Sequence, residues 1–572
     1  MVRNSKPFVF IYILFVLFSS ALLFSSQLMA AEESGCSISL EHSDANKVEI
    51  SVDLLNLDIK PDNQGEGYVI RIPGESIGGS PGGFDLPHIS RMIVIPPSAG
   101  IELDWSASEV RTLSSKTPSI VTDKSQSEEH QWVGPTLMRQ TGLLPENVVE
   151  IGDPVIMRGI RMVNVTVNPV QYNPVSGDLL VYDKIDVKLN FTDNNVVNPV
   201  ANPGRIRPSE AVLSVARSMV LNTDALERDD PEMKGSYVFV IPEFDGLRDV
   251  IAPLIEWRTR QGYPTQVIEI NRWVGNNELR NMLIDAYFDW EIPPEYVTII
   301  GEADRRRVDF SIPTFDVGRA FMWETDYTYS LLDGNDMLPD VAIGRLSARN
   351  LDDLGVIVNK IISYETNPHL VDDDGNDDSA WLRRSALLAN DQRTGYSAIF
   401  LNRWLRKMLL DTGFEEVDTL YFTSNPNQQD CHDFIERNIT DGISMFNYRG
   451  WGQFNGAWAY EDAGRLNNVG KWPFLVLPTC NTGDFADHVL NEFGYTESFV
   501  WVEGGGIGAL GSSGFTHTNY NNVLCGGIQN GLFRDNNWHF GWALNQGKME
   551  LYRHFGMFND VQDPQVETLL VW

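Results

Sequence analysis

The sequence predicts an α/β protein made of two successive units, each a mostly parallel sheet flanked by helices, preceded by an all-β, sandwich-like domain. Residues 36–195 alternate apolar and polar side chains in short runs broken by Gly, Pro and Asn, as antiparallel strands do. From residue 236 onward, continuous apolar runs alternate with helix-like segments, which is typical of parallel sheets covered on both faces. This pattern occurs on both sides of an acidic segment at 371–380.

The N-terminal residues have the composition of a signal peptide, which we assign to residues 1–31. Arg3 and Lys6 precede an apolar stretch over 8–24, and small residues follow it. The apolar stretch is rather long, so an uncleaved membrane anchor is the alternative. Cleavage would give a secreted, extracellular protein, with the periplasm or the cell surface as alternative locations, and would leave no membrane span in the mature chain.

The charge balance excludes some classes of partner. The chain has 44 Lys and Arg residues against 78 Asp and Glu residues, a formal net charge of −34. Such a surface repels the phosphates of nucleic acids and anionic lipid headgroups, so we expect no nucleic-acid partner. It suits a protein that works outside the cell.

The predicted all-β domain covers residues 32–196, and the amino-acid composition changes at its end. Residues 197–235 are rich in Pro, Arg and Asp and show little apolar periodicity outside a short segment at 209–221. We expect an exposed linker there, because such segments are where proteases cut most easily. The arginines available for an activation cleavage are Arg205, Arg207, Arg217 and Arg228.

The two α/β units are assigned to residues 236–380 and 381–565. In the first, we expect strands at 237–242, 264–270 and 296–304, and helices at 247–262, 276–290 and 352–365. In the second, we expect strands at 383–391, 443–450, 474–480 and 506–514, and helices at 396–413 and 431–442. Glycine at the end of several of these helices supports their boundaries.

Metal sites find little support in the sequence. The four cysteines are Cys36, Cys431, Cys480 and Cys525, and they are too widely spaced for a zinc site. A single disulfide among the first, second and fourth of them stays open. The acidic segment 371–380 could hold a structural Ca²⁺ ion, although it lacks the glycine of an EF-hand loop. A solvated charged linker is the preferred interpretation, and we expect no required cofactor.

The ends of the second unit's strands carry chemically useful residues. Ligands of open α/β sheets bind beyond the carboxyl ends of the strands. The residues predicted at that edge are Asp391, 449–452, 480–483 and 516–517. A thiol, an imidazole and a carboxylate at one edge are the parts of a cysteine nucleophile with its base and orienting acid. The glycines among them leave backbone N–H groups that could bind an oxyanion.

Cys480 is the central candidate in this set. It follows the apolar run 474–477 and opens into small, turn-forming residues, so its thiol is predicted to be presented at a strand exit rather than packed inside. The alternative is a free thiol that happens to lie near a turn.

At this point the sequence resembles the gingipain-type cysteine peptidases, which share the caspase-like clan fold. The stretches that carry the resemblance are 167–191, 237–270, 331–365, GISMFNYRGWG at 442–452 and PTCNTGDFA at 478–486. The resemblance implies a secreted cysteine endopeptidase, made as a proenzyme, that acts on protein or peptide substrates. It also implies that 32–196 is a propeptide domain and that 381–565 is the catalytic, caspase-like subdomain.

Carried over residue by residue, the resemblance places the nucleophile on Cys480 and the orienting acid on Asp391. The usual catalytic histidine falls on Trp451, and an indole cannot accept a proton. The chain is therefore similar to a divergent branch of the family, in which His517 is the expected base; His488 is a weaker candidate. The competing interpretation of His517 is an ordinary loop histidine.

Two functions stay open from the sequence. The first is an active cysteine endopeptidase with Cys480, His517 and Asp391 as catalytic residues. The second is a catalytically inactive, gingipain-like surface or adhesion protein on the same scaffold, because a thiol without a base is a poor nucleophile at neutral pH.

Further residues are expected to bind the oxyanion or the substrate. They are Gly450, Trp451, Gly452 and Gly483. Trp451 could form a wall of the first substrate pocket or could simply pack in the core. The helix beginning near Gly395 offers no acidic residue up to Trp404, so we expect no strict preference for Arg or Lys substrates.

Overall fold

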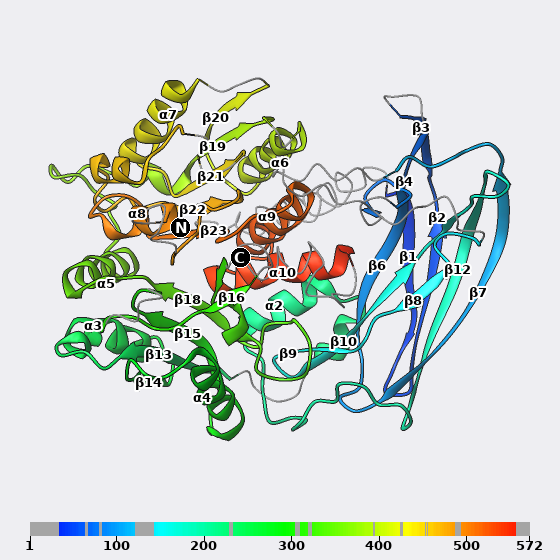
Figure 1. The fold of residues 1–572 in the computed structure, drawn as a ribbon, viewed down its shortest axis with the longest axis horizontal. Helices are drawn as coiled ribbons and strands as arrows, with labels where there is room; N and C mark the ends of the chain where they lie inside the picture. Colours follow the sequence, from blue (N-terminus) through cyan, green and yellow to red (C-terminus); the bar gives the residue numbers. More distant parts are fainter. Residues whose placement is uncertain are drawn as a thin grey trace, which may run out of the picture.

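The fold in Figure 1 is that of a computed structural model. It describes residues 34–555 apart from 63–66, 79–82, 121–141, 228–232, 304–308, 318–322, 393–394, 424–426, 452–453, 455 and 487–493. The predicted signal peptide and His488 lie outside the described residues. No helix in the described part of the chain is both long and apolar enough to cross a membrane.

The N-terminal region consists of antiparallel strands, as predicted, in two five-stranded sheets. One sheet has the order β1-β2-β12-β11 with β7 also paired to β12, and the other has β5-β6-β10-β8 with β9 also paired to β10. Val48 and Ile185 of the first sheet and Ile93 and Val163 of the second belong to one buried apolar cluster, so the sheets pack face to face. These strands are β1 (Cys36–Ser43), β2 (Lys47–Leu54), β5 (Ser76–Gly78), β6 (Leu86–Val94), β7 (Gly100–Leu113), β8 (Val149–Ile151), β9 (Val155–Met157), β10 (Ile160–Val167), β11 (Val170–Asn173) and β12 (Asp178–Thr192), with the separate hairpin β3 (Asp58–Pro61) and β4 (Tyr68–Arg71).

The first α/β unit has a four-stranded parallel sheet with the order β14-β13-β15-β18. Every residue of β15 is buried, as expected for a parallel strand covered on both faces. The elements are β13 (Ser236–Pro242), α3 (Leu247–Arg260), β14 (Thr265–Ile270), α4 (Asn276–Asp289), β15 (Pro294–Ile300), β18 (Ala342–Leu346) and α5 (Leu351–Thr366), with the small hairpin β16 (Phe315–Val317) and β17 (Trp323–Thr325).

The second α/β unit has a five-stranded parallel sheet with the order β20-β19-β21-β22-β23. The prediction of two parallel sheets flanked by helices is thus confirmed. Four elements were not expected: the edge strand β20 and the last three helices. The elements are β19 (Arg384–Asn390), α6 (Ser397–Asp411), β20 (Glu416–Phe422), α7 (Gln428–Asp441), β21 (Met445–Arg449), β22 (Phe474–Leu477), α8 (Tyr495–Trp501), β23 (Gly508–Gly511), α9 (Thr518–Phe533) and α10 (Phe540–Phe555).

The segment expected to be an exposed linker is instead partly buried. It contains α2 (Glu210–Met219), whose apolar face is covered. Val215 and Met219 share a buried cluster with Met162 of the β region and Trp542 of α10. The helix α2 therefore packs against both the β region and α10. An amphipathic helix of this length gains more from burying its apolar face than from remaining in water.

The described arginines of this segment are not presented as open cleavage sites. The Arg205 guanidinium donates to the carbonyl oxygens of Tyr287 and Trp290, at 2.6 and 2.8 Å. Arg207 is exposed but precedes Pro208, and Arg217 lies within α2. Arg228 lies outside the described residues.

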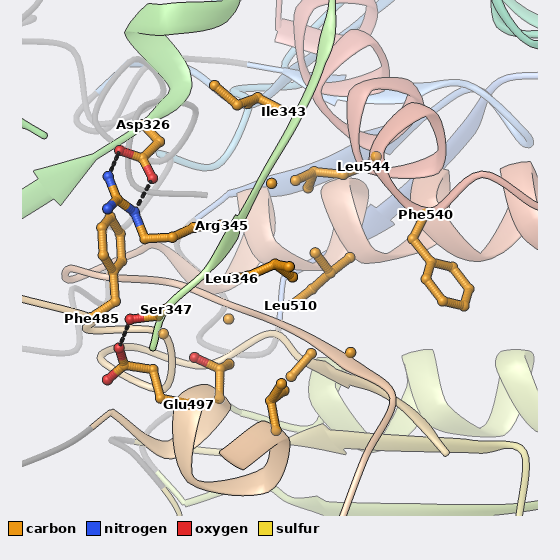
Figure 2. A pocket seen from close by; sticks show the side chains of 18 of the residues that line it. Asp326, Ile343, Arg345, Leu346, Ser347, Phe485, Glu497, Leu510, Phe540 and Leu544 are labelled. Atoms are coloured by element: carbon orange, nitrogen blue, oxygen red, sulfur yellow. Dashed lines mark hydrogen bonds and ion pairs between the residues drawn. The ribbon is translucent and has the colours of Figure 1, made fainter. Parts of the chain in front are cut away.

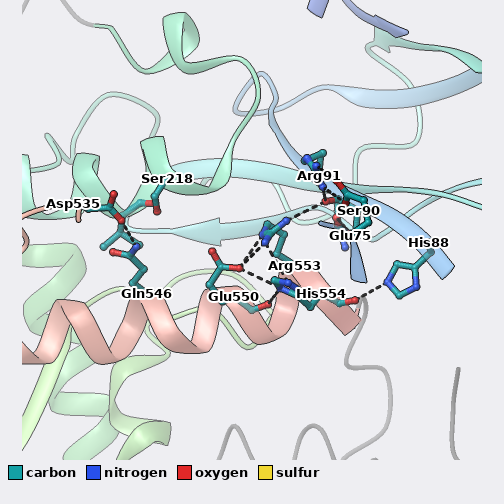
Figure 3. A network of polar contacts seen from close by, with 12 residues as sticks. Glu75, His88, Ser90, Arg91, Ser218, Asp535, Gln546, Glu550, Arg553 and His554 are labelled. Atoms are coloured by element: carbon teal, nitrogen blue, oxygen red, sulfur yellow. Dashed lines mark hydrogen bonds and ion pairs between the residues drawn. The ribbon is translucent and has the colours of Figure 1, made fainter. Parts of the chain in front are cut away.

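Polar contacts also join the β region to the last helix. In Figure 1, α10 lies between the β region and the two α/β units. Figure 3 shows His88 of β6 directed at the end of α10, where its Nε2 donates to the His554 carbonyl at 2.6 Å. On α10, Glu550 pairs with Arg553 at 2.8 Å and with the His554 ring at 3.1 Å. The β region is therefore docked on the second α/β unit by both apolar and polar contacts.

Candidate active site

Cys480 lies three residues beyond β22, at the carboxyl edge of the second sheet. Its Sγ accepts a hydrogen bond from the Thr516 amide at 3.3 Å and lies 3.5 Å from the Thr516 carbonyl oxygen. The residue is only 3% exposed. The thiol is therefore at the strand exit, as predicted, but it is covered by the segment that leads into α9.

The turn after Cys480 is fixed to the neighbouring strand. Asn481 adopts a positive φ of 54°, a conformation that asparagine tolerates better than most residues, and its amide donates to the Gly514 carbonyl. The Gly483 amide donates to the Ser512 carbonyl at 2.9 Å. A side chain at Gly483 would collide with the backbone of Gly511, so this close approach requires glycine. The turn and the end of β23 form one rigid loop pair.

His517 directly follows Thr516, the residue whose backbone contacts the Cys480 thiol. It is the N-cap residue of α9, with an extended backbone, and its ring contacts that of Tyr520 edge-on, with centroids 5.5 Å apart. Because Thr516 donates to the Cys480 Sγ, the residue that follows it is held at the same sheet edge. The structure thus brings the two segments together; the role of His517 as the base stays a prediction.

Asp391 lies at the same edge but further along it. It follows β19, where its amide donates to the Phe422 carbonyl at 3.2 Å. The sheet order places β21 and β22 between β19 and β23. Three spacings of about 4.8 Å therefore separate the strand before Asp391 from the strand before His517. The orienting role of Asp391 stays a prediction. It requires the His517 side chain, at the start of α9, to extend along the sheet edge toward the end of β19.

The expected oxyanion-binding glycines have occupied amides. The Gly450 amide donates to the Thr479 hydroxyl at 3.2 Å, and the Gly483 amide donates to Ser512. Either amide could hold an oxyanion only after exchanging its present acceptor. Trp451 is half-buried, and Gly452 lies outside the described residues.

The acidic segment at 371–380 forms a loop closed by its own side chains. The Asp372 carboxylate accepts hydrogen bonds from the amides of Asp374 and Asn376, and Asp377 accepts from Ser379. Hydrogen bonds from the side chain and then the backbone of Asn376 lower the pKa of Asp372, and those from the side chain and backbone of Ser379 lower the pKa of Asp377. No group of three or more potential metal ligands occurs among the residues that the structure describes, and a structural Ca²⁺ ion stays untested.

Two family models match the chain. The model of peptidase family C25 matches residues 230–570, and the model of the C25 propeptide matches residues 36–226.

The chain belongs to peptidase family C25.

Curated C25 relatives are distant. Gingipain R2 of Porphyromonas gingivalis is 23% identical over 430 residues, which are 71% of this chain and 54% of that protein. Lys-gingipain W83 of Porphyromonas gingivalis is 21% identical over 475 residues, 78% of this chain and 26% of that protein. The chain thus spans about half the length of the gingipain R2 that it matches.

Among solved structures, the crystal structure of the Arg-specific cysteine proteinase gingipain R is similar. The TM-score is 0.49 at 18% sequence identity, covering 60% of this chain and 78% of that one.

The Cys480 thiol of this C25 peptidase family member has an unfavourable environment for ionisation. Burial raises the pKa of the Cys480 thiol above its ordinary value, while hydrogen bonds from Thr516 and the positive charge of Arg449 lower it. Burial is the largest of these effects and favours the protonated thiol. None of the four cysteines forms a disulfide in the structure, so the bridge that the sequence left open is not formed.

Arg449 is the site residue for which no role was predicted. It ends β21 and is 0% exposed. Burial lowers the pKa of its guanidinium to about 10, so it is still charged at neutral pH. A signal was present in the sequence, since Arg449 belongs to the predicted strand 443–450 of a parallel sheet covered on both faces, where side chains are buried.

A pocket of about 360 Å³ lies between the two α/β units, beside the loop that follows Cys480. Its walls are largely apolar, with Leu510 and Leu544 among them. Figure 2 shows Arg345 paired with Asp326 on one wall, at 2.7 Å. Gly483 lines the pocket, so the loop that follows Cys480 forms part of the boundary between the units. This pocket was not predicted from the sequence, because its walls come from both units.

Proposed function

We propose that this C25 family member is a secreted cysteine endopeptidase, made as a proenzyme, that hydrolyses peptide bonds through the thiolate of Cys480. The observation that carries the proposal is the hydrogen bond from the Thr516 amide to the Cys480 Sγ, at 3.3 Å. It joins the strand exit that bears the thiol to the residue before His517, so a thiol and an imidazole share one sheet edge. The propeptide match over 36–226 supports synthesis as a proenzyme.

In the proposed mechanism, the His517 imidazole takes the proton of the Cys480 thiol, and the thiolate attacks the carbonyl carbon of the scissile peptide bond. The tetrahedral intermediate collapses when the protonated imidazole gives its proton to the leaving amine, which leaves a thioester. Water, deprotonated by the same imidazole, then attacks the thioester carbon and releases the acid product and the free thiol. Asp391 is proposed to orient the imidazole.

The oxyanion would be held by backbone amides at the two loops. Gly450 and Gly483 supply the proposed donors, with Trp451 and Gly452 in contact with the substrate. Because both glycine amides have acceptors in the described structure, substrate binding must displace Thr479 from Gly450 or Ser512 from Gly483. We propose protein or peptide substrates, no cofactor, and no strict Arg or Lys preference.

A catalytically silent surface protein is the second candidate. Two observations favour it: Cys480 is only 3% exposed, and Trp451 stands where the resemblance places a histidine. On this alternative the family scaffold is retained for binding alone.

Alkylation of the full-length chain by iodoacetamide, followed residue by residue by mass spectrometry, distinguishes the two candidates. Between about pH 6 and 7, near the usual pKa of histidine, an active site should show Cys480 modified faster than Cys431. His517→Ala should abolish this advantage, whereas His42→Ala, on the exposed end of β1, should preserve it. Equal, slow labelling of all four cysteines would establish the silent scaffold.

Hydrolysis of a peptide library measures the same site independently. Cys480→Ala should remove all turnover, and His517→Ala should lower kcat by about 10²- to 10⁴-fold, the usual contribution of a general base. His42→Ala serves again as the matched histidine control, with kcat unchanged. Turnover that survives Cys480→Ala would assign the activity to another residue.

A further inference from the structure

Three hydrogen bonds hold the Arg449 guanidinium between the loop after β21 and the start of α9. Its Nε donates to the Asn522 side-chain oxygen at 3.0 Å, and its Nη2 donates to the Thr518 carbonyl at 3.0 Å. Its Nη1 donates to the Gly450 carbonyl at 3.2 Å. The first two acceptors belong to the first turns of α9 and the third to the loop after β21, so the guanidinium ties these two elements together.

The positive charge of Arg449 has no carboxylate partner among the described residues, since all three of its acceptors are neutral. Arg345, the buried arginine of the first unit, is instead paired with Asp326 at 2.7 Å. A buried charge is costly when neutral acceptors compensate it only in part, so an anion formed near this guanidinium would be stabilised by it.

The nearby groups that could become that anion are thiols. Arg449 lowers the pKa of the Cys480 thiol and of the Cys525 thiol, so both lie within its field. Cys525 is 0% exposed on α9, where reagents and substrate do not reach it. Cys480, at the sheet edge, is the thiol that a substrate could approach.

A continuous set of contacts links the guanidinium to the nucleophile. Arg449 holds the Thr518 carbonyl, and two residues earlier the Thr516 amide donates to the Cys480 Sγ. The Asn521 side chain donates to the Thr516 hydroxyl at 2.6 Å, which fixes the same turn. The other titratable groups at this edge are Asp391 after β19, Tyr448 of β21, His517 before α9 and Cys525 of α9.

We propose that Arg449 is a positioning residue of the site, whose buried positive charge stabilises the Cys480 thiolate and so supplies the charge that the indole of Trp451 cannot. The inference rests on the proposed peptidase function. It assigns proton transfer to His517 and electrostatic stabilisation to a permanent cation, two tasks that a single imidazolium combines in other cysteine nucleophiles. The thiolate would then persist while the imidazole is neutral.

The test is the pH dependence of Cys480 alkylation by iodoacetamide in the full-length chain. Arg449→Met removes the charge and all three hydrogen bonds, and we expect it to raise the apparent pKa of Cys480 by at least about one unit, a tenfold loss of thiolate. Arg449→Lys keeps the charge and should keep most of the wild-type profile. An Arg449→Met profile that coincides with the wild type would overturn the inference.

Two further variants separate charge from structure. Asn522→Ala removes the Nε acceptor without changing any charge, and it should leave the thiol pKa in place. A shift in this variant as large as that of Arg449→Met would show a structural role only and would overturn the inference. If Arg449→Met does not fold, Arg449→Gln provides the neutral variant, since its amide can still donate to Thr518.

The outcomes also separate this inference from the proposed function. A wild-type Cys480 no more reactive than Cys431 would overturn both. A selectively reactive wild-type Cys480 that loses its advantage in His517→Ala but not in Arg449→Met would leave the peptidase proposal standing and refute the role of Arg449 alone.

Discussion

Cys525 shows how burial controls a thiol directly beneath the site. It is 0% exposed, and its Sγ lies 3.5 Å from the Asn447 side-chain oxygen. Burial raises its pKa from 9.0 to about 12. A thiol whose folded pKa is raised contributes stability that is fully present below the unfolded pKa and is lost as the pH rises through the folded one.

This linkage gives a prediction for Cys525→Ser. Above pH 9.0 the wild type should lose about 1.4 kcal/mol of unfolding free energy per pH unit because of this thiol, a loss that serine does not share. Urea unfolding at pH 8 and pH 10 measures the change for both proteins, and the difference between the two changes isolates Cys525. A difference near zero would mean that the buried thiol ionises as easily as one in water.

At the residue scale, the sequence identified Cys480, but it could not identify the charge state of the thiol. The strand-then-turn pattern at 474–483 is local, and the structure has the turn where it was expected. Burial of the thiol under Thr516 and its exposure to the field of Arg449 depend on residues far away in the sequence.

At the element scale, α9 and α10 form a close helix pair that was not predicted. The sequence of α9 contains Gly526, Gly527 and Gly531 together with several asparagines. Because glycine and asparagine have low helix propensity, this segment would be expected to form a loop. An added side chain at Gly527 would lie 2.7 Å from the Cα of Gly547 on α10. Tertiary packing therefore outweighs propensity here, because only glycine allows the two backbones to approach so closely.

Two neighbouring glycines give a matched pair of variants. Gly527→Ala should destabilise the protein by about 1–3 kcal/mol, because its methyl group would overpack the contact with α10. Gly526→Ala meets no atom within 4 Å and should gain up to about 1 kcal/mol from helix propensity. Urea unfolding compares the two; a stabilised Gly527→Ala would contradict the close approach.

Lys360 connects α5 of the first unit to the end of α8 in the second. Its Nζ donates to the carbonyl oxygens of Val500, Val502 and Gly504 at 2.9–3.0 Å, and the residue is 3% exposed. Lys360→Met would leave these carbonyls without a donor, and we expect a loss of at least about 3 kcal/mol in urea unfolding. Lys407→Met, on the exposed face of α6, is the control and should change stability by no more than about 0.5 kcal/mol.

At the scale of the whole molecule, α2 and α10 make the β region part of one body with the α/β units. Val215 of α2, Met162 of the β region and Trp542 of α10 share a buried cluster. A trypsin cut within residues 228–232 should therefore leave the two fragments together, eluting as one species in size-exclusion chromatography at neutral pH. Separation on cutting alone would mean that the shared cluster contributes little.

Acidification should weaken this association. Burial lowers the pKa of His88, so burying its neutral ring stabilises the association above the ordinary pKa of 6.5, and this contribution is lost as the pH falls through the lower folded value. The charged groups around it are Glu75 and Arg91 of the β region and Glu550, Arg553 and His554 of α10. More of the cut protein should dissociate as the pH falls below 6.5.

His88→Gln tests the origin of this pH dependence. The glutamine amide can still donate to the His554 carbonyl but does not titrate, so dissociation of the cut variant should change less with pH. Analytical ultracentrifugation at pH 7 and pH 5 measures both proteins. Identical pH profiles for the wild type and the variant would assign the effect to the other charged groups.

The sequence by itself predicted β13, β14, β15 and the three helices of the first unit, the antiparallel character of the N-terminal region and the position of Cys480 at a strand exit. Hydrophobic periodicity, turn residues and strand ends are local properties, and they can be read without knowing what each element contacts.

Tertiary structure alone decided what those elements contact. It buried α2 where a linker was expected, and it made a helix, α9, of the glycine-rich segment at 518–533. It also brought Arg449 to the start of α9, near Cys480, with no carboxylate paired to its guanidinium in the described residues. Each of these depends on apolar area, backbone clearance or electric field contributed by residues distant in the chain. These quantities exist only once the chain has folded, because burial and low dielectric are properties of the packed interior.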